Sequence, residues 1–146
     1  MIDFNTYEEV KLEDVAEYAR AKKGKIYPAG TTTLQISATR GQIEYLTYPS
    51  EVHTKDVAII PQAGINPKYF NIVMKKNIDE FMRKYATGIN IQEKEVGNFP
   101  IQLHNSEAQD AIAKMVGYAE KQEQIAQQEI DNLKELKNTL LNKMMC

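Results

Sequence analysis

The sequence of residues 106–143 is SEAQDAIAKMVGYAEKQEQIAQQEIDNLKELKNTLLNK, with Gly117 as its only helix breaker. Ser106 is followed three residues later by Gln109, which is the spacing of a capping box, so we predict that one helix begins at Ser106. If this helix runs to about Lys143, it is roughly 57 Å long at about 1.5 Å per residue. It is then longer than a small domain is wide.

An apolar stripe follows this predicted helix, because apolar residues recur at every seventh position, as they do in coiled coils. Gln122 and Glu123 interrupt the stripe, and polar residues at such positions fix the register of paired helices. The helix can fold back on its own domain or pair with another chain, and its length favours pairing. The residues predicted to form a homodimer are Ile112, Ala119, Ala126, Leu133, Leu136 and Leu140.

Helix breakers divide the chain. All five prolines and six of the seven glycines lie at or before Pro100. This distribution predicts an α+β fold, with a small mixed α/β domain over residues 1–104 followed by one long helix over residues 105–146.

The spacing of apolar residues predicts the elements of the first domain. Leu12 and Val15 favour a short helix over residues 11–21. Asn66 and Pro67 are typical of a helix start, and Asn77 with Glu80 resembles a capping box that opens a second helix, ended by Gly88. Alternating or continuous apolar residues predict strands over residues 33–37, 43–47 and 57–60.

Composition narrows the class of protein. Cys146 is the only cysteine among 146 residues, so no internal disulfide can form, and no run of 18 apolar residues occurs. The N-terminus lacks the basic and apolar regions of a signal peptide. We therefore predict a soluble cytoplasmic protein without a membrane segment.

The formal net charge of −2 hides an uneven distribution. Residues 20–94 hold twelve basic and six acidic side chains, whereas residues 1–19 and 95–146 are acidic. Hydroxyl and amide side chains such as Thr32 and Gln35 lie in the basic segment, and such groups bind phosphate and read base edges. A solvated face beside half-buried tyrosines explains the same composition, so both interpretations remain open.

Signatures of catalysis are missing. His53 and His104 lack the spacing of metal ligands, and no glycine-rich phosphate loop or serine nucleophile motif occurs. Asn66 to Tyr69 differ from the Asn-Pro-Pro-Tyr signature of amino-methyltransferases at Lys68. We predict no metal, no cofactor and no catalytic residue.

The order of several segments resembles half of a DNA specificity subunit of type I restriction-modification systems, one target recognition domain followed by one spacer helix. The opening KLEDVAEY of residues 11–18, with the basic turn after it, is similar to the "KLGDIAE…GK" opening of these domains. Further matching segments are residues 58–61, 66–70, 85–92, 98–101, 107–109 and 133–141. The match therefore covers nearly the whole chain.

Two departures qualify the resemblance. Members of the family usually carry two such halves, and their proline-rich "PPLEEQ" start of the helix is replaced here by residues 103–109. The family holds two recognition domains apart by antiparallel helices, so that each reads half of a split target, while separate subunits methylate adenine. The resemblance thus implies a homodimer with an antiparallel coiled coil and a palindromic split site.

The resemblance also implies partners and site residues. The predicted partners are double-stranded DNA, a second copy of the chain, a methyltransferase modification subunit and, in some systems, a restriction subunit. The predicted phosphate contacts are Lys22, Lys23, Lys25, Lys68, Lys75, Lys76, Arg83 and Lys84. The predicted base contacts are Thr32, Gln35, Thr39, Arg40, Asn90 and Gln92.

A function of another class stays open beside this one. The chain could be a helix-mediated interaction protein, such as a phage or mobile-element decoy that displaces a host specificity subunit without reading DNA. Binding to DNA distinguishes the two hypotheses.

Overall fold

A computed structural model of the chain describes residues 2–36, 42–85 and 92–145. The chain divides into two compact units, Met1–Ala113 and Lys114–Cys146. The division falls inside the long helix, and the domain boundary at residue 104 stays a prediction. The first unit holds every described strand, and the second is helical.

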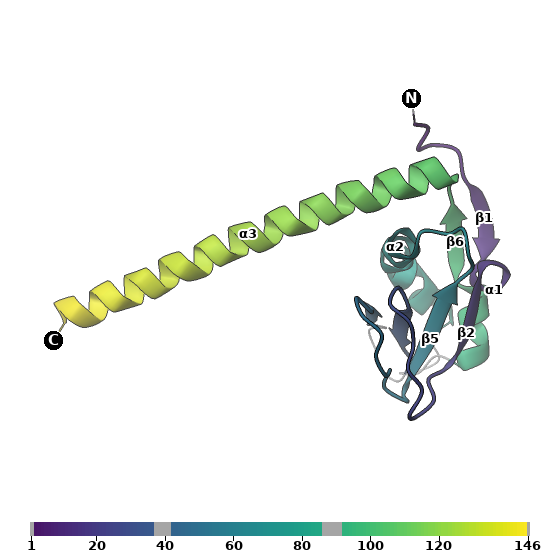
Figure 1. Cartoon of the computed structure of the whole chain (residues 1–146), viewed down its shortest axis with the longest axis horizontal. Helices are drawn as coiled ribbons and strands as arrows, with labels where there is room; N and C mark the ends of the chain where they lie inside the picture. The colour runs from purple at the N-terminus through teal and green to yellow at the C-terminus, as the bar shows by residue number, and fades with distance from the viewer. Residues whose placement is uncertain (1, 37–41, 86–91, 146) are drawn as a thin grey trace. The chain divides into compact units, whose positions relative to one another are not determined.

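The first unit is built on a four-stranded antiparallel sheet in the order β2-β5-β3-β4. Figure 1 labels two neighbouring strands of this sheet, β2 and β5. Its strands are β2 (Ala16–Arg20), β3 (Thr32–Gln35), β4 (Ile43–Tyr45) and β5 (Asp56–Pro61). The strands predicted from the sequence around residues 33–37, 43–47 and 57–60 are therefore confirmed within the described residues.

A second, two-stranded sheet joins the two ends of this unit. Strand β1 (Glu8–Lys11) pairs antiparallel with β6 (Pro100–Leu103), and Glu8 lies opposite Leu103. Neither strand was predicted from the sequence. Their partners are about ninety positions apart along the chain, so no local pattern marks the pairing.

Helix α2 (Pro67–Tyr85) covers one face of the four-stranded sheet. The side-chain oxygen of Asn66 accepts hydrogen bonds from the backbone N–H groups of Lys68 and Tyr69, at 3.0 and 3.1 Å. Asn66 is therefore the N-cap and Pro67 the first helical residue, as predicted.

The prediction of a second helix beginning at Asn77 is wrong, because α2 runs through this position without a break. The side chain of Asn77 is buried and donates hydrogen bonds to the backbone oxygen of Pro100 at 2.9 Å and to Oε1 of Gln102 at 2.7 Å. It thus attaches α2 to β6 instead of capping a helix. Gly88 lies outside the described residues.

The prediction of a helix over residues 11–21 is also wrong. Only α1 (Leu12–Val15) is helical, and the chain continues as β2, in which Tyr18 lies opposite Ile59 of β5. Leu12 and Val15 both lie in α1, so their spacing marks this single turn and says nothing about the residues after it. Hydrogen bonding to β5 overrides the helical preference of the following residues.

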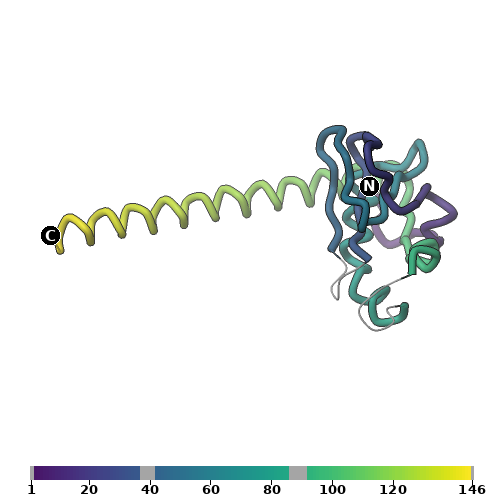
Figure 2. The backbone as a smooth tube through the Cα atoms, turned by 90° about the horizontal axis from the view of Figure 1, so that it is seen from below, coloured from purple at the N-terminus to yellow at the C-terminus, as the bar shows by residue number. Residues whose placement is uncertain are grey.

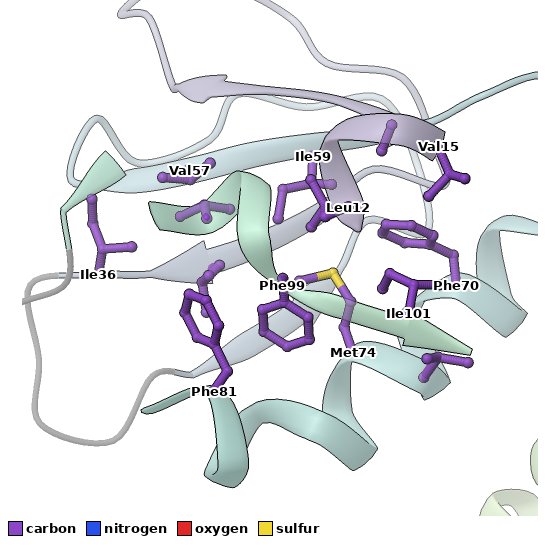
Figure 3. Packing of buried hydrophobic residues seen from close by; sticks show 14 of the residues in the cluster. Leu12, Val15, Ile36, Val57, Ile59, Phe70, Met74, Phe81, Phe99 and Ile101 are labelled. Atoms are coloured by element: carbon purple, nitrogen blue, oxygen red, sulfur yellow. The ribbon is translucent and has the colours of Figure 1, made fainter. Parts of the chain in front are cut away.

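The core of the first unit lies between the sheet, α2 and the segment 96–101 (Figure 3). Val57 and Ile59 point into it from alternate positions of β5, and Phe81 packs on Phe99 with ring centroids 4.6 Å apart. The first residues of this segment belong to the 3-10 helix η1 (Glu93–Asn98). Each fully buried side chain of this size contributes about 1.5–3 kcal/mol.

Helix α3 (Ser106–Met144) begins where the sequence predicted, but its cap is different. The side chain of Asn105, not Ser106, accepts a hydrogen bond from the backbone N–H of Ala108 at 2.8 Å. The buried side chain of Gln109 donates to the backbone oxygen of His104 at 2.7 Å and accepts from the backbone N–H of Asn66 at 2.9 Å. The predicted capping box is therefore not formed.

The second unit consists of the later turns of α3, which form an unbroken helix (Figure 2). Its apolar stripe is exposed, since Leu133, Leu140 and Met144 are 65%, 49% and 77% accessible in the single chain. Pairing of this helix with another stays a prediction. In the ranges that the structure describes, no helix combines the length and apolar character needed to cross a membrane.

Candidate nucleic-acid interface

The four-stranded sheet has an outer face, which we define as the face opposite α2. Leu34, Val57 and Ile59 point toward α2, so the residues between them point the other way. On strands β3, β4 and β5, the residues that the outer face presents are Thr33, Gln35, Glu44, Asp56, Ala58 and Ile60. Most of them are polar, whereas the face toward α2 is apolar.

Two connections are held against the outer face. Tyr27, between β2 and β3, exchanges backbone hydrogen bonds of 2.8 and 3.1 Å with Ser50, between β4 and β5. Tyr27 also packs with Val52 and Ala58, and its hydroxyl accepts a hydrogen bond from the backbone N–H of Lys22 at 3.0 Å. These contacts fix the basic turn over residues 22–25, in which Gly24 adopts the left-handed conformation that favours glycine (φ 81°).

A basic hollow of about 210 Å³ opens beside this turn, at the edge strand β2. Its cationic groups are Arg20, Lys22 and Lys25, and one acid, Glu17, also lines it. The ammonium group of Lys25 lies 5.0 Å from the centre of the Tyr27 ring, which favours a cation. The structure therefore brings the predicted residues Lys22 and Lys25 together, with Lys23 exposed on the same turn.

A polar hollow of about 350 Å³ lies over the other strands of the outer face. It is lined by Thr33, Gln35, Gln42, Glu44, His53, Lys55 and Asp56. Burial is the main cause that raises the pKa of the Asp56 carboxyl; nearby Glu44 acts in the same direction and His53 opposes it. Of the predicted base contacts, Gln35 is the one that lines this hollow.

The other predicted phosphate contacts lie on α2, on the opposite side of the sheet from both hollows. They are Lys68, Lys75, Lys76, Arg83 and Lys84. The ammonium group of Lys68 lies 5.3 Å from the Tyr45 ring centre. Arg83 and Lys84 occupy the last turn of α2, where positive charge stabilises the helix dipole. The predicted contacts thus divide between two surfaces.

One predicted base contact is corrected by the structure. Thr32 is 0% exposed, and its hydroxyl accepts a hydrogen bond from the side chain of Asn71 at 3.2 Å, so it cannot reach DNA in this structure. Gln92 is exposed just before η1 and lines neither hollow, although the side chain of the next residue, Glu93, accepts a hydrogen bond from the backbone N–H of Arg20 at 2.7 Å. Thr39, Arg40 and Asn90 lie outside the described residues.

Sequence reasoning missed several residues of the two hollows. Residues that were not among the predicted contacts include Arg20, Gln42, Glu44, His53, Lys55 and Asp56. Their common position depends on strand register, in which Thr33 lies opposite Glu44 and Gln35 opposite Asp56. Across the residues that the structure covers, no three histidine, cysteine or acidic side chains are grouped so that they could hold a metal ion.

Solved structures with the same fold are restriction-modification proteins. The S subunit of a type I restriction-modification system from M. genitalium superposes with a TM-score of 0.64 at 18% identity, over 94% of this chain and 45% of that one. The chain has the fold of a type I restriction-modification specificity subunit.

Two further structures agree with this specificity-subunit fold. One comes from a study of complex assembly and conformational transition of the type I R-M system (TM-score 0.66, 11% identity, 84% of this chain and 40% of that one). The other is the HsdS subunit from Thermoanaerobacter tengcongensis (TM-score 0.62, 11% identity, 84% and 39%). The chain thus spans less than half the length of the structures that it matches. No protein-family model and no curated protein sequence matches it.

Proposed function

We propose that the chain is a non-catalytic DNA specificity subunit of a type I restriction-modification system, which binds double-stranded DNA through its first unit. The observation that carries this proposal is the specificity-subunit fold over 84% to 94% of the chain. The outer face adds the chemistry, since a basic hollow that suits phosphate lies beside polar side chains that suit base edges.

The basic hollow is the proposed phosphate site. Arg20, Lys22 and Lys25 line it from the end of β2 and the turn that follows, and the turn is fixed by Tyr27. Neutralising phosphates releases counterions, so DNA affinity should fall steeply as the salt concentration rises. The lysines of α2 are a separate candidate surface, and variants of the two surfaces tell them apart.

The apolar stripe of α3 is the proposed dimer interface, with a second copy of the chain as its partner. Leu133, Leu136 and Leu140 are about half exposed or more, although burial of each contributes about 1.5–3 kcal/mol. Antiparallel pairing would give two-fold symmetry and a palindromic split DNA target.

The proposed complex includes a modification subunit that methylates adenine, with a restriction subunit as a further partner. This part of the proposal rests on the resemblance in sequence order and on the type I systems named for the matching structures. The chain itself would supply recognition, and its partner would supply the catalytic groups.

Selection from a random duplex library tests the proposal. The full chain, alone and with a type I modification subunit, should enrich a defined sequence at low salt, and the preferred site should be split and palindromic. Failure to prefer any sequence in either form would contradict DNA recognition. If the chain then still bound a host specificity or modification subunit, the helix-mediated decoy would explain the fold better.

A further inference from the structure

The polar hollow differs chemically from a phosphate site. Among the described residues, its lining has two carboxylates, Glu44 and Asp56, against one lysine, Lys55, so it lacks the excess of positive charge that phosphate needs. The side chains of Gln35 and Gln42 on the same lining both donate and accept hydrogen bonds. Within the part of the chain that the structure describes, the basic hollow on the same sheet face is lined by three basic residues and only one acidic residue. The two hollows therefore suit different parts of a nucleic acid.

Backbone pairing holds the lining residues in place. In the β3–β4 ribbon, Thr33 lies opposite Glu44, and the backbone N–H of Gln35 donates to the oxygen of Gln42 at 2.9 Å. On the other side, Gln35 lies opposite Asp56 of β5. Two hydrogen bonds to His53 close the turn before β5. The backbone N–H of Lys55 donates to Nδ1 of His53 at 3.2 Å, and the backbone N–H of Asp56 donates to the backbone oxygen of His53 at 2.9 Å.

This construction fits the major groove of DNA. A two-stranded ribbon is one of the elements that the groove admits, and β4 is an edge strand of the sheet. Gln42, Glu44 and Lys55 are exposed around the hollow. Strand β3 lies two strand spacings from β2, about 10 Å at about 4.8 Å each. That distance is smaller than the width of the major groove, about 12 Å, so a phosphate at the rim of the groove and a base edge inside it can be contacted together.

Carboxylate oxygens select one feature of a base edge. In the major groove, cytosine presents the amino group N4 and adenine the amino group N6, and both donate hydrogen bonds. Guanine O6 and thymine O4 are acceptors, which a carboxylate repels. Resting on the proposed function, we infer that Glu44, with Gln35 beside it, reads an exocyclic amino group of cytosine or adenine in the major groove.

Base analogues test this assignment on the preferred duplex found by selection with the full chain. Purine in place of adenine, or 2-pyrimidinone in place of cytosine, removes one amino group at a time. For the unchanged protein, affinity should fall roughly five- to 150-fold at one position, as expected for a lost base contact of about 1–3 kcal/mol. For Glu44→Thr, which keeps a residue that favours strands, the analogue should make no difference.

Controls separate this inference from the proposed function. Glu51→Thr changes an exposed carboxylate that does not line the hollow, so it should keep the response to the analogue. Gln35→Ala provides a second variant, and circular dichroism checks the folding of each. The inference is overturned if Glu44→Thr and Gln35→Ala respond to the analogue as the unchanged protein does. It is also overturned if removal of no amino group changes the affinity. In both cases the proposed sequence-specific binding still stands. Absence of any sequence preference would overturn both.

Discussion

The side chain of Gln109, in the first turn of α3, accepts a hydrogen bond from the backbone N–H of Asn66 at 2.9 Å. Asn66 caps α2, so one buried amide connects the starts of two helices. The same amide donates to the backbone oxygen of His104. This contact links the end of β6 to both helices within the first unit.

Removing this amide should destabilise the first unit. We expect Gln109→Ala to lower the free energy of unfolding by about 1–3 kcal/mol, because the N–H of Asn66 then loses its partner in a buried position. Urea unfolding followed by circular dichroism measures the change. Gln124→Ala, at an exposed position of α3, is the matched control and should have little effect. Equal stability of the two variants would contradict a structural role for Gln109.

The charge of the basic hollow should control the salt dependence of DNA binding. Lys22→Ala combined with Lys25→Ala should reduce the slope of log affinity against log salt by about 1.8, if each lysine neutralises one phosphate. Fluorescence anisotropy over a salt series gives the slope. The comparison variant is Lys75→Ala with Lys76→Ala on α2. A larger loss in that variant would move the DNA surface to the other side of the sheet.

The leucines of α3 should hold the proposed dimer together. Leu133→Glu with Leu140→Glu should weaken association by at least about ten-thousandfold, because the dimer loses four leucine contacts of about 1.5–3 kcal/mol each. Analytical ultracentrifugation reports the mass. Gln124→Glu with Asn138→Glu adds equal charge away from the stripe and should leave the dimer intact. A dimer that survives the leucine substitutions would place the interface elsewhere.

Asp56 should make stability depend on pH in a defined direction. Its pKa is raised in the folded chain, mainly by burial, so the folded state binds this proton more tightly than the unfolded state. Stability should therefore fall as the pH rises from the ordinary value of 3.8 through the folded value. Asp56→Asn removes this carboxyl group. Between low and neutral pH, the variant should therefore lose less stability than the unchanged protein. Unfolding curves measured between pH 3 and 7 give the free energy of unfolding of both proteins. If the difference between them is the same at every pH, Asp56 is not the source of the pH dependence.

The parts of the fold that could be predicted are those with local signals. The long helix was found because its apolar period persists over many turns, and the start of α2 because Asn66 and Pro67 act within one turn. Strand β2 was mistaken for helix because the helical spacing of Leu12 and Val15, which form α1, was extended to the residues after them. Strand β1 was missed because its partner β6 is distant in the chain.

The candidate interface could be predicted in composition but not in arrangement. Lys22 and Lys25 share one turn, so their sequence proximity sufficed. The polar hollow draws side chains from three strands and a turn, and which of them face outward depends on a register that the sequence does not display. Thr32 illustrates the difficulty, because its neighbour Thr33 points to the opposite face.

The pairing of β1 with β6 has a consequence for how such a domain can change over time. The first and last strands of the unit are neighbours, so the chain enters and leaves it at adjacent points. Units whose two ends lie close together tolerate circular permutation and insertion into another chain, because connecting the ends strains the backbone little. A unit closed in this way can be duplicated or exchanged as one genetic cassette. Under the proposed function, such an exchange would supply a new DNA preference by recombination without redesign of the helix that follows.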